Sequence, residues 1–289
     1  MHLSELFENA YRPQRLIGRA DGTLIQYRHA IAMFGNPPLD SITDSSFADF
    51  MQRRLNEGVS RPTVNKERRH LMALFNFAAK RSLLPRKPDV PPVAEYRRLP
   101  RAWTVSDIGR MIAAAKLNTK RFRQWDVSHG DFWTAFILLL FDTGIRKSVL
   151  LKAKPADADL QRRFIRIHAE HQKRMNEQVL TFSQQTADAL AAIAGPWDYL
   201  LPWPFDRYKA TGWKRLNTHF RRILTRAGLP TTGKYFHRFR ASRASYGELS
   251  APGSAQSVLG HADIATTRRY LDPLILAESR LVDLLPRPG

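Results

Sequence analysis

Three short segments, far apart in the chain, each place a potential phosphate-binding side chain at a turn or a helix end. They are Thr143-Gly-Ile-Arg146, His237-Arg-Phe-Arg240, and Leu259-Gly-His261 followed by Thr266-Thr-Arg-Arg-Tyr270. A guanidinium group grips two phosphate oxygens at once in a planar geometry. A helix N-terminus adds backbone donors for the same anion. Because His237 and Arg240 are three residues apart, they share one helix face, and the three segments together predict a phosphate-binding site.

The composition agrees with a polyanionic partner. Among 289 residues, 46 Lys and Arg face 26 Asp and Glu, for a formal net charge of +20. Such an excess indicates nucleic acid or an anionic membrane surface. The basic residues are interleaved with apolar ones, as in 12–28, 53–69 and 215–243, rather than gathered in a tail. That distribution is typical of folded basic faces.

Several classes of protein are disfavoured. The chain has no cysteine, hence no disulfide framework, thiolate nucleophile or Cys-based zinc site. Residues 1–11 lack the apolar core of a signal peptide. The longest apolar block, Ala135–Phe141, is far too short to span a bilayer. We therefore expect a soluble cytoplasmic protein, associated with the nucleoid, with nucleic acid and no membrane as its partner.

Five prolines between residues 85 and 100 mark an extended stretch, because proline blocks helix continuation. The sequence thus predicts a helical N-terminal domain over 1–84, a proline-rich linker over 85–101, and a larger C-terminal domain over 102–289 that ends in a helix. Length alone also favours two domains.

The first domain reads as all-helical, with helices over 21–34, 43–56 and 62–80. The last of these carries an apolar stripe that includes Leu71 and Phe75, and its basic residues Lys66, Arg68 and Arg69 lie off that stripe. Such a helix packs inward and presents its charge outward, although a plain helical bundle would show the same pattern.

The second domain begins with a capping signal over 104–107, and a strongly apolar helix over 132–142 ends at Gly144. Two β-prone runs, 163–168 and 178–183, follow. Further helices are predicted over 185–193, 213–227, 237–249, 254–259, 264–270 and 274–285. The predicted fold class is mainly α, with one small antiparallel sheet in the second domain.

The pattern resembles the tyrosine recombinases, also called the phage integrase family. The matching features are Arg146 after a glycine turn, the His237 and Arg240 pair, the Leu-Gly-His turn ending at His261, and Tyr270 nine residues later. The paired threonines before that tyrosine also match. Each feature alone occurs often by chance, and each residue alone is more often a packing or surface residue. All four in order, behind a basic helical domain, are specific, and the resemblance covers nearly the whole chain.

The family also uses a lysine between two strands. Lys173 lies between the two β-prone runs, seven residues before Leu180, which matches the family's spacing. One departure concerns the position three residues after the first arginine, where the family commonly has a buried Glu and this chain has Val149. That change bears on local packing more than on chemistry.

The resemblance implies a mechanism. Tyr270 would attack the scissile phosphate and form a 3′-phosphotyrosyl link. A tyrosine hydroxyl ordinarily titrates near pH 10 and needs help to lose its proton, and His237 is the expected acceptor. Arg146 and Arg240 would neutralise the charge on the non-bridging oxygens, with His261 as a further donor. Lys173 would protonate the departing 5′-oxygen.

No cofactor and no metal is expected, since no acidic cluster is evident. The pair His168 and His171 lacks a third ligand and is interpreted as chance. The expected partner is double-stranded DNA. The leading hypothesis for the function is site-specific recombination, which means integration, excision or resolution of the DNA of a mobile element. The resemblance implies a homo-tetramer on two synapsed sites, with the apolar helix 274–285 docking on a neighbouring protomer or folding back on its own domain.

Two other functions use the same residues. A type IB topoisomerase relaxes DNA through the same tyrosine chemistry without strand exchange. An inactive or architectural DNA-binding protein would keep only the affinity for DNA. The presence of the whole set, from Arg146 to Tyr270, disfavours the inactive alternative, because drift would break at least one member. Helices 62–80 and 213–227 are candidates for contacts in the DNA grooves.

Overall fold

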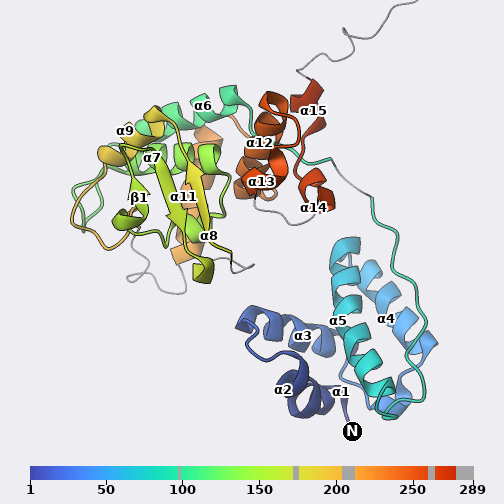
Figure 1. Ribbon diagram of the computed structural model, residues 1–289. Coiled ribbons are helices and arrows are strands. Elements are labelled where there is room, and N and C mark those ends of the chain that lie inside the picture. Colours follow the sequence, from blue (N-terminus) through green and yellow to red (C-terminus); the bar gives the residue numbers. More distant parts are fainter. Residues whose placement is uncertain (97–98, 172–175, 204–211, 260–263, 278–289) are drawn as a thin grey trace, which may run out of the picture. The chain divides into compact units, whose positions relative to one another are not determined.

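The computed structural model describes the chain apart from residues 97–98, 172–175, 204–211, 260–263 and 278–289. The chain divides into two compact units, Met1–Arg97 and Arg98–Gly289 (Figure 1). Each unit has its own hydrophobic core. The division falls inside the proline-rich segment 85–101. Among the described residues, no helix combines the length and the apolar character needed to cross a bilayer.

The longer helices of the N-terminal unit begin and end at signals that the sequence carries. Helix α3 spans Asp21–Phe34, as predicted, and ends where Gly35 adopts a left-handed φ of 89°. Helix α4 spans Asp44–Asn56 and is capped by the Thr43 hydroxyl. Helix α5 spans Arg61–Ala79. Polar caps satisfy backbone donors that have no partner within the helix.

Aromatic side chains build the core of this unit. The ring of Phe47 meets that of Phe75 edge-on at 5.1 Å between centroids, and Phe34 packs edge-on against both. All three side chains are buried, and burying one phenylalanine contributes roughly 1.5–3 kcal/mol. The apolar stripe predicted for α5 is therefore the face that holds the unit together.

Three short elements at the N-terminus were not predicted. Helix α1 (Leu3–Leu6), a π-helical turn (Phe7–Tyr11) and helix α2 (Arg12–Arg15) follow one another directly. Together they form one helical run, in which the buried Leu3, Leu6, Phe7 and Tyr11 stand at helical spacing, so the sequence carried a signal that the prediction missed. Leu3, Leu6 and Phe7 are fully buried in the core of the N-terminal unit, which explains why the segment is ordered.

The first part of the proline-rich segment is extended and lies along α5. The Asn65 side chain donates to the Val93 carbonyl at 2.8 Å and accepts from its N–H at 2.9 Å. The Arg68 guanidinium donates to the Val90 carbonyl at 2.9 Å. Arg68 was expected on the basic outer face of α5, but its guanidinium is bound to the backbone of this segment.

The C-terminal unit is mainly helical with one small sheet, which confirms the predicted fold class. Its first elements are α6 (Val105–Lys116), α7 (His129–Thr143), α8 (Lys147–Leu150), β1 (Ala158–Asp159), β2 (Phe164–Ile167) and β3 (Gln178–Thr181). They are followed by α9 (Gln184–Ala191), α11 (Gly212–Arg226), α12 (Tyr235–Ser250), α13 (Ala255–Leu259), α14 (Ile264–Arg268) and α15 (Pro273–Leu276).

The sheet is antiparallel in the order β1-β2-β3. Strands β2 and β3 are the two predicted runs, paired so that Ile165 lies opposite Leu180. Strand β1, only two residues long, was not predicted. Residues 172–175, between β2 and β3 in the sequence, lie outside the described residues, and Lys173 is one of them.

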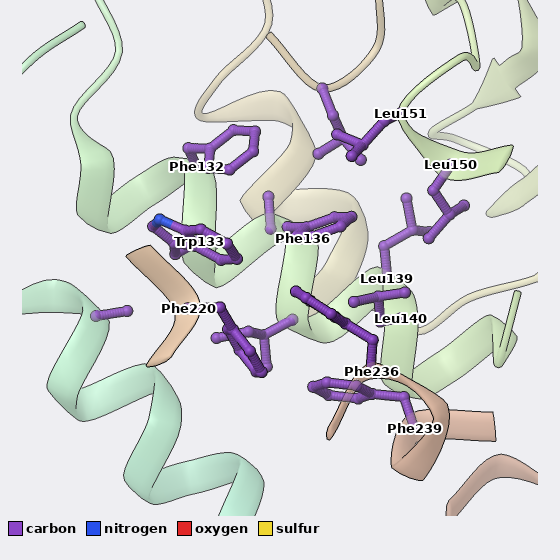
Figure 2. Packing of buried hydrophobic residues seen from close by; sticks show 14 of the residues in the cluster. Phe132, Trp133, Phe136, Leu139, Leu140, Leu150, Leu151, Phe220, Phe236 and Phe239 are labelled. Carbon is purple, nitrogen blue, oxygen red and sulfur yellow. The ribbon is translucent and has the colours of Figure 1, made fainter. Parts of the chain in front are cut away.

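Helix α7 forms the centre of the larger core (Figure 2). Trp133 on α7 stacks on Phe220 of α11 at 5.4 Å, and Phe220 stacks on Phe236 of α12 at 4.5 Å. Val149, which stands where a buried glutamate was expected from the resemblance, is buried in the same cluster. This aromatic stack joins three helices behind the predicted site.

Two helix boundaries differ from the prediction near the candidate residues. Helix α12 begins at Tyr235, so His237 lies within its first turn and does not open it. Helix α14 ends at Arg268, so Tyr270 follows the helix and is not part of it. Tyr270 keeps one turn-like bond, in which its N–H donates to the Thr267 carbonyl at 2.8 Å.

Candidate active site

The turn that carries Arg146 is packed against α12. Gly144 has a φ of 60°, and a Cβ at this position would lie 2.9 Å from the Cβ of Arg243 on α12. Glycine is therefore required both for the left-handed backbone and for the close approach. Arg146 follows as the N-cap residue of α8 with an extended backbone, and its side chain is partly exposed.

Arg240 is the structural centre of the site. Its side chain is buried, with 2% of the residue exposed. One guanidinium nitrogen, Nη1, donates to the Gly144 carbonyl at 2.8 Å, and Nη2 donates to the Leu259 carbonyl at 3.2 Å. Three segments predicted from the sequence are thus joined by one side chain. Burial, and then the like charge of Arg146, lower the pKa of Arg240 to about 10, which leaves it charged at neutral pH.

Tyr270 lies against Arg240. The guanidinium carbon is 5.4 Å from the centroid of the tyrosine ring. Charge attraction to Tyr270 and a side-chain hydrogen bond between the two residues partly offset the lowering of the Arg240 pKa. The tyrosine is partly exposed. A guanidinium that donates to a phenol oxygen stabilises negative charge developing there. The phenol is therefore both accessible and in contact with a fixed cation.

Asp272 anchors the segment that follows Tyr270, and sequence reasoning did not find it. This buried carboxylate accepts from the Ala102 N–H at 2.7 Å and from the Leu274 N–H at 3.0 Å. Its own N–H donates to the Ser245 hydroxyl on α12 at 2.7 Å. The backbone on the C-terminal side of Tyr270 is thereby fixed to α12 and to the start of the unit. Contacts over such sequence distances leave no local signal.

His237 is solvent-accessible on the first turn of α12. The surrounding protein lowers its pKa, first through partial loss of solvent and then through the charges of Lys234, Arg240, Arg146 and Lys147. The imidazole is consequently neutral near pH 7 and able to accept a proton. Arg146, Arg240 and Tyr270 are brought to the same region as this histidine.

Two of the predicted residues, Lys173 and His261, lie outside the described residues. Residues 278–285 of the expected C-terminal helix do so as well. Within the described part of the chain, no group of three or more histidine or acidic side chains is arranged to hold a metal ion. His168, treated as a chance match, has its Nε2 2.8 Å from a carboxylate oxygen of Asp157.

Helix α11 presents a basic face in the same unit. The helix contains no acidic residue. A surface cavity of about 560 Å³ is lined by Thr218, Arg221, Arg222, Thr225, Arg226 and Thr231. Among the described residues, none of these three arginines has a carboxylate partner. Such a face retains its charge for an external anion.

Comparisons with known proteins now assign the class. The Phage integrase family profile matches residues 110–274, and the profile "Phage integrase, N-terminal domain" matches residues 2–87. The chain therefore belongs to the phage integrase family and is a site-specific DNA recombinase of the tyrosine type.

Individual relatives agree with this assignment. The tyrosine recombinase XerC of Corynebacterium efficiens is 25% identical over 268 residues, covering 88% of this chain and 82% of that protein. The tyrosine recombinase XerD of Rhizobium meliloti is 29% identical over 199 residues, covering 65% of this chain and 61% of that protein.

Solved structures share the fold. A lambda integrase dimer bound to a COC′ core site has a TM-score of 0.73 at 19% identity, covering 94% of this chain and 77% of that one. The Tn1549 transposon integrase in complex with a circular intermediate DNA has a TM-score of 0.70 at 16% identity, covering 94% and 95%. At these identities the likeness concerns the fold.

Proposed function

We propose that this recombinase cuts DNA with Tyr270 and rejoins it by the reverse step. The tyrosine oxygen attacks the scissile phosphorus, a 3′-phosphotyrosyl bond forms, and the bond to the 5′-oxygen breaks. The observation that carries the proposal is the buried Arg240, which joins the segments of Gly144 and Leu259 and contacts Tyr270. In the reverse step a 5′-hydroxyl attacks the link and releases the tyrosine, so rejoining needs no ATP.

The proposed role of the two arginines is to neutralise charge on the non-bridging oxygens. Arg240 is held by two backbone carbonyls, so its position is set before the substrate arrives. Preorganised donors of this kind avoid reorganisation during the reaction, and removing one typically costs about 10²–10³ in rate. Arg146, partly exposed on its turn, is able to meet the phosphate from another side.

Proton transfers are assigned to two residues, and a further hydrogen bond to a third. His237, neutral near pH 7, accepts the proton of the tyrosine hydroxyl. Lys173 donates a proton to the departing 5′-oxygen, and His261 donates a hydrogen bond to the phosphate. The last two roles rest on the family resemblance, since both residues lie outside the described residues.

Duplex DNA is the proposed substrate, bound through the phosphate backbone. Arg221, Arg222 and Arg226 of α11 support a DNA contact there. Lys66 and Arg69 of α5 are candidates in the N-terminal unit, whereas Arg68 is engaged by the Val90 carbonyl. An enzyme with this substrate acts at the nucleoid, in the cytoplasm.

We further propose a tetramer on two synapsed sites. A lambda integrase tetramer bound to a Holliday junction has the same fold, with a TM-score of 0.72 at 18% identity, covering 94% of this chain and 78% of that one. In the described part of the C-terminal segment, Ile275 is buried against Ala102 and Ala241, while Leu274 is 75% exposed. The segment 274–285 thus begins on its own unit and has an apolar side chain available for a neighbour. A transposon integrase among the similar folds supports a mobile element as the origin.

The test is a covalent adduct. Wild type and Tyr270→Phe are incubated with a pool of nicked duplexes that covers the DNA flanking the gene. We expect wild type to form an adduct that resists denaturant and the variant to form none. Adduct from both proteins would remove Tyr270 as the nucleophile. Tight DNA binding without adduct from either would favour an inactive DNA-binding protein, and relaxation without strand exchange would favour a topoisomerase.

A further inference from the structure

Lys147 occupies an unusual position for a lysine. It directly follows Arg146 and opens α8, and its side chain is partly buried. Its ammonium donates to the Asn217 side-chain oxygen on α11 at 2.6 Å. The same nitrogen lies 4.4 Å from the centroid of the Phe236 ring and 5.4 Å from that of Trp213. A turn lysine is ordinarily solvated, whereas this one is enclosed by an amide and two rings.

The partners of Lys147 hold its charge without cancelling it. A hydrogen bond from a charged donor is stronger than one between neutral groups, and an aromatic face attracts a cation through its ring electrons. Among the described residues, no carboxylate pairs with this ammonium. Burial lowers the pKa of Lys147 from its ordinary value near 10. The contacts with Asn217, Phe236 and Trp213 hold the Lys147 ammonium in one position.

The side chain of Lys147 connects the segment that carries Arg146 with the segment that carries His237. Phe236 immediately precedes His237, and its ring is fixed by stacking on Phe220 at 4.5 Å. Asn217 and Trp213 belong to α11, so the side chain of Lys147 on α8 contacts both α11 and α12. A shift of Lys147 would change the distance between the arginine turn and the start of α12.

We propose, building on the function assigned to Tyr270, that Lys147 is a positioning residue of the cleavage reaction. Its ammonium fixes the Arg146 turn relative to His237 and places a further positive charge on the histidine side of the site. Among the described residues, the cations facing His237 are Lys234 before α12, Arg240 on α12, and Arg146 and Lys147 on the neighbouring turn. Of the two that have no task in the mechanism, Lys234 is exposed, whereas Lys147 is partly buried and contacts Asn217 and Phe236.

The decisive variants are Lys147→Met and Asn217→Ala. Methionine keeps an unbranched apolar stem against the rings but loses the charge and the bond to Asn217. Asn217→Ala keeps the charge and frees the ammonium. Lys147→Arg keeps the charge with another geometry and tests rescue. Lys116→Met, which removes an exposed lysine at the end of α6, is the matched control.

The first readout needs no substrate. The His237 ring is titrated by NMR in the free protein, with His237→Ala to assign its signal. We expect the pKa of His237 to rise in Lys147→Met, because one like charge is removed, and to stay unchanged in Lys116→Met. A smaller rise is expected in Asn217→Ala. An unchanged His237 titration in Lys147→Met would overturn the proposal.

The second readout is single-turnover adduct formation at saturating DNA, followed against pH. We expect Lys147→Met to cleave about tenfold to a hundredfold more slowly, with its acid limb shifted to higher pH, while DNA affinity stays within about twofold. Lys147→Arg should recover part of the rate. A rate loss that only parallels lost DNA affinity or lost thermal stability, with the pH profile unchanged, would overturn the positioning role. Should wild type form no adduct, the proposed function fails, and the His237 titration alone decides on Lys147.

Discussion

One central arginine in each unit of the chain is held in a different way. The N-terminal unit has 15 basic and 10 acidic residues, and the C-terminal unit has 31 and 16. In the first, Arg54 is held by Glu67 through two hydrogen bonds of 3.0 and 2.9 Å, inside the protein. In the second, Arg240 is held by carbonyls, and Arg221 and Arg222 of α11 have no carboxylate partner among the described residues. A carboxylate neutralises the charge of Arg54 within the fold, whereas a cation without a carboxylate partner retains its charge for phosphate.

The largest expected effect of this difference is on Arg240. Arg240→Lys keeps the charge but cannot serve both carbonyls and a phosphate in one plane. We expect single-turnover adduct formation to fall by at least about 10². In Arg54→Lys, at saturating DNA, the rate should stay within about twofold of wild type. Equal losses in both variants would contradict the contrast between the units.

A second experiment removes the carboxylate partner of Arg54 and measures the free energy of unfolding. Glu67 is 3% exposed, and Glu67→Gln leaves the charge of Arg54 without this buried carboxylate partner. Breaking a buried ion pair on one side typically costs about 3–5 kcal/mol. We expect urea denaturation to show a loss of that order in the free energy of unfolding. A change below about 1 kcal/mol would mean that the pair is effectively solvated.

Local sequence patterns predicted individual helix ends, whereas the long-range contacts around the candidate site left no signal in the sequence. Helix α3 and the glycine end of α7 follow from local periodicity and backbone conformation, which act over a few residues. The predicted end of α14 at Tyr270 was wrong, because the Asp272 anchor that fixes the following segment depends on Ala102, some 170 residues away. Lys147 was missed for the same reason, since its partner Asn217 lies 70 residues on.

A moderate effect on DNA affinity is expected from the cations without carboxylate partners. Replacing Arg221 and Arg222 by Gln should weaken binding to all sequences and lower the salt dependence by roughly one ion for each phosphate that the protein no longer binds. Arg86→Gln is the control, because Arg86 is paired with Asp44. Fluorescence anisotropy at several salt concentrations measures the DNA affinity and its salt dependence for the double variant and for the control. An equal change in the control would show that pairing does not decide which cations meet DNA.

The smallest effect concerns pH and stability. Burial, then the charge of His129, Arg222 and Arg215, lower the pKa of His219 to about 4. The pKa of His219 in the folded protein lies below its value near 6.5 in the unfolded chain. The contribution of neutral His219 to the free energy of unfolding is therefore complete above pH 6.5 and is lost as the pH falls toward 4. His219→Gln should make the free energy of unfolding depend less on pH between 7 and 5. An unchanged slope would remove His219 as the cause.

The most direct test of the central claim is to find the atom that carries the DNA. The adduct formed on nicked DNA is digested with nuclease and protease, and the nucleotide-bearing peptide is sequenced by mass spectrometry. We predict a nucleotide attached through its 3′-phosphate to the oxygen of Tyr270. The Tyr270→Phe protein should yield only the unmodified peptide. A nucleotide on another tyrosine, such as Tyr246 on α12, would contradict the assignment of Tyr270 as the nucleophile.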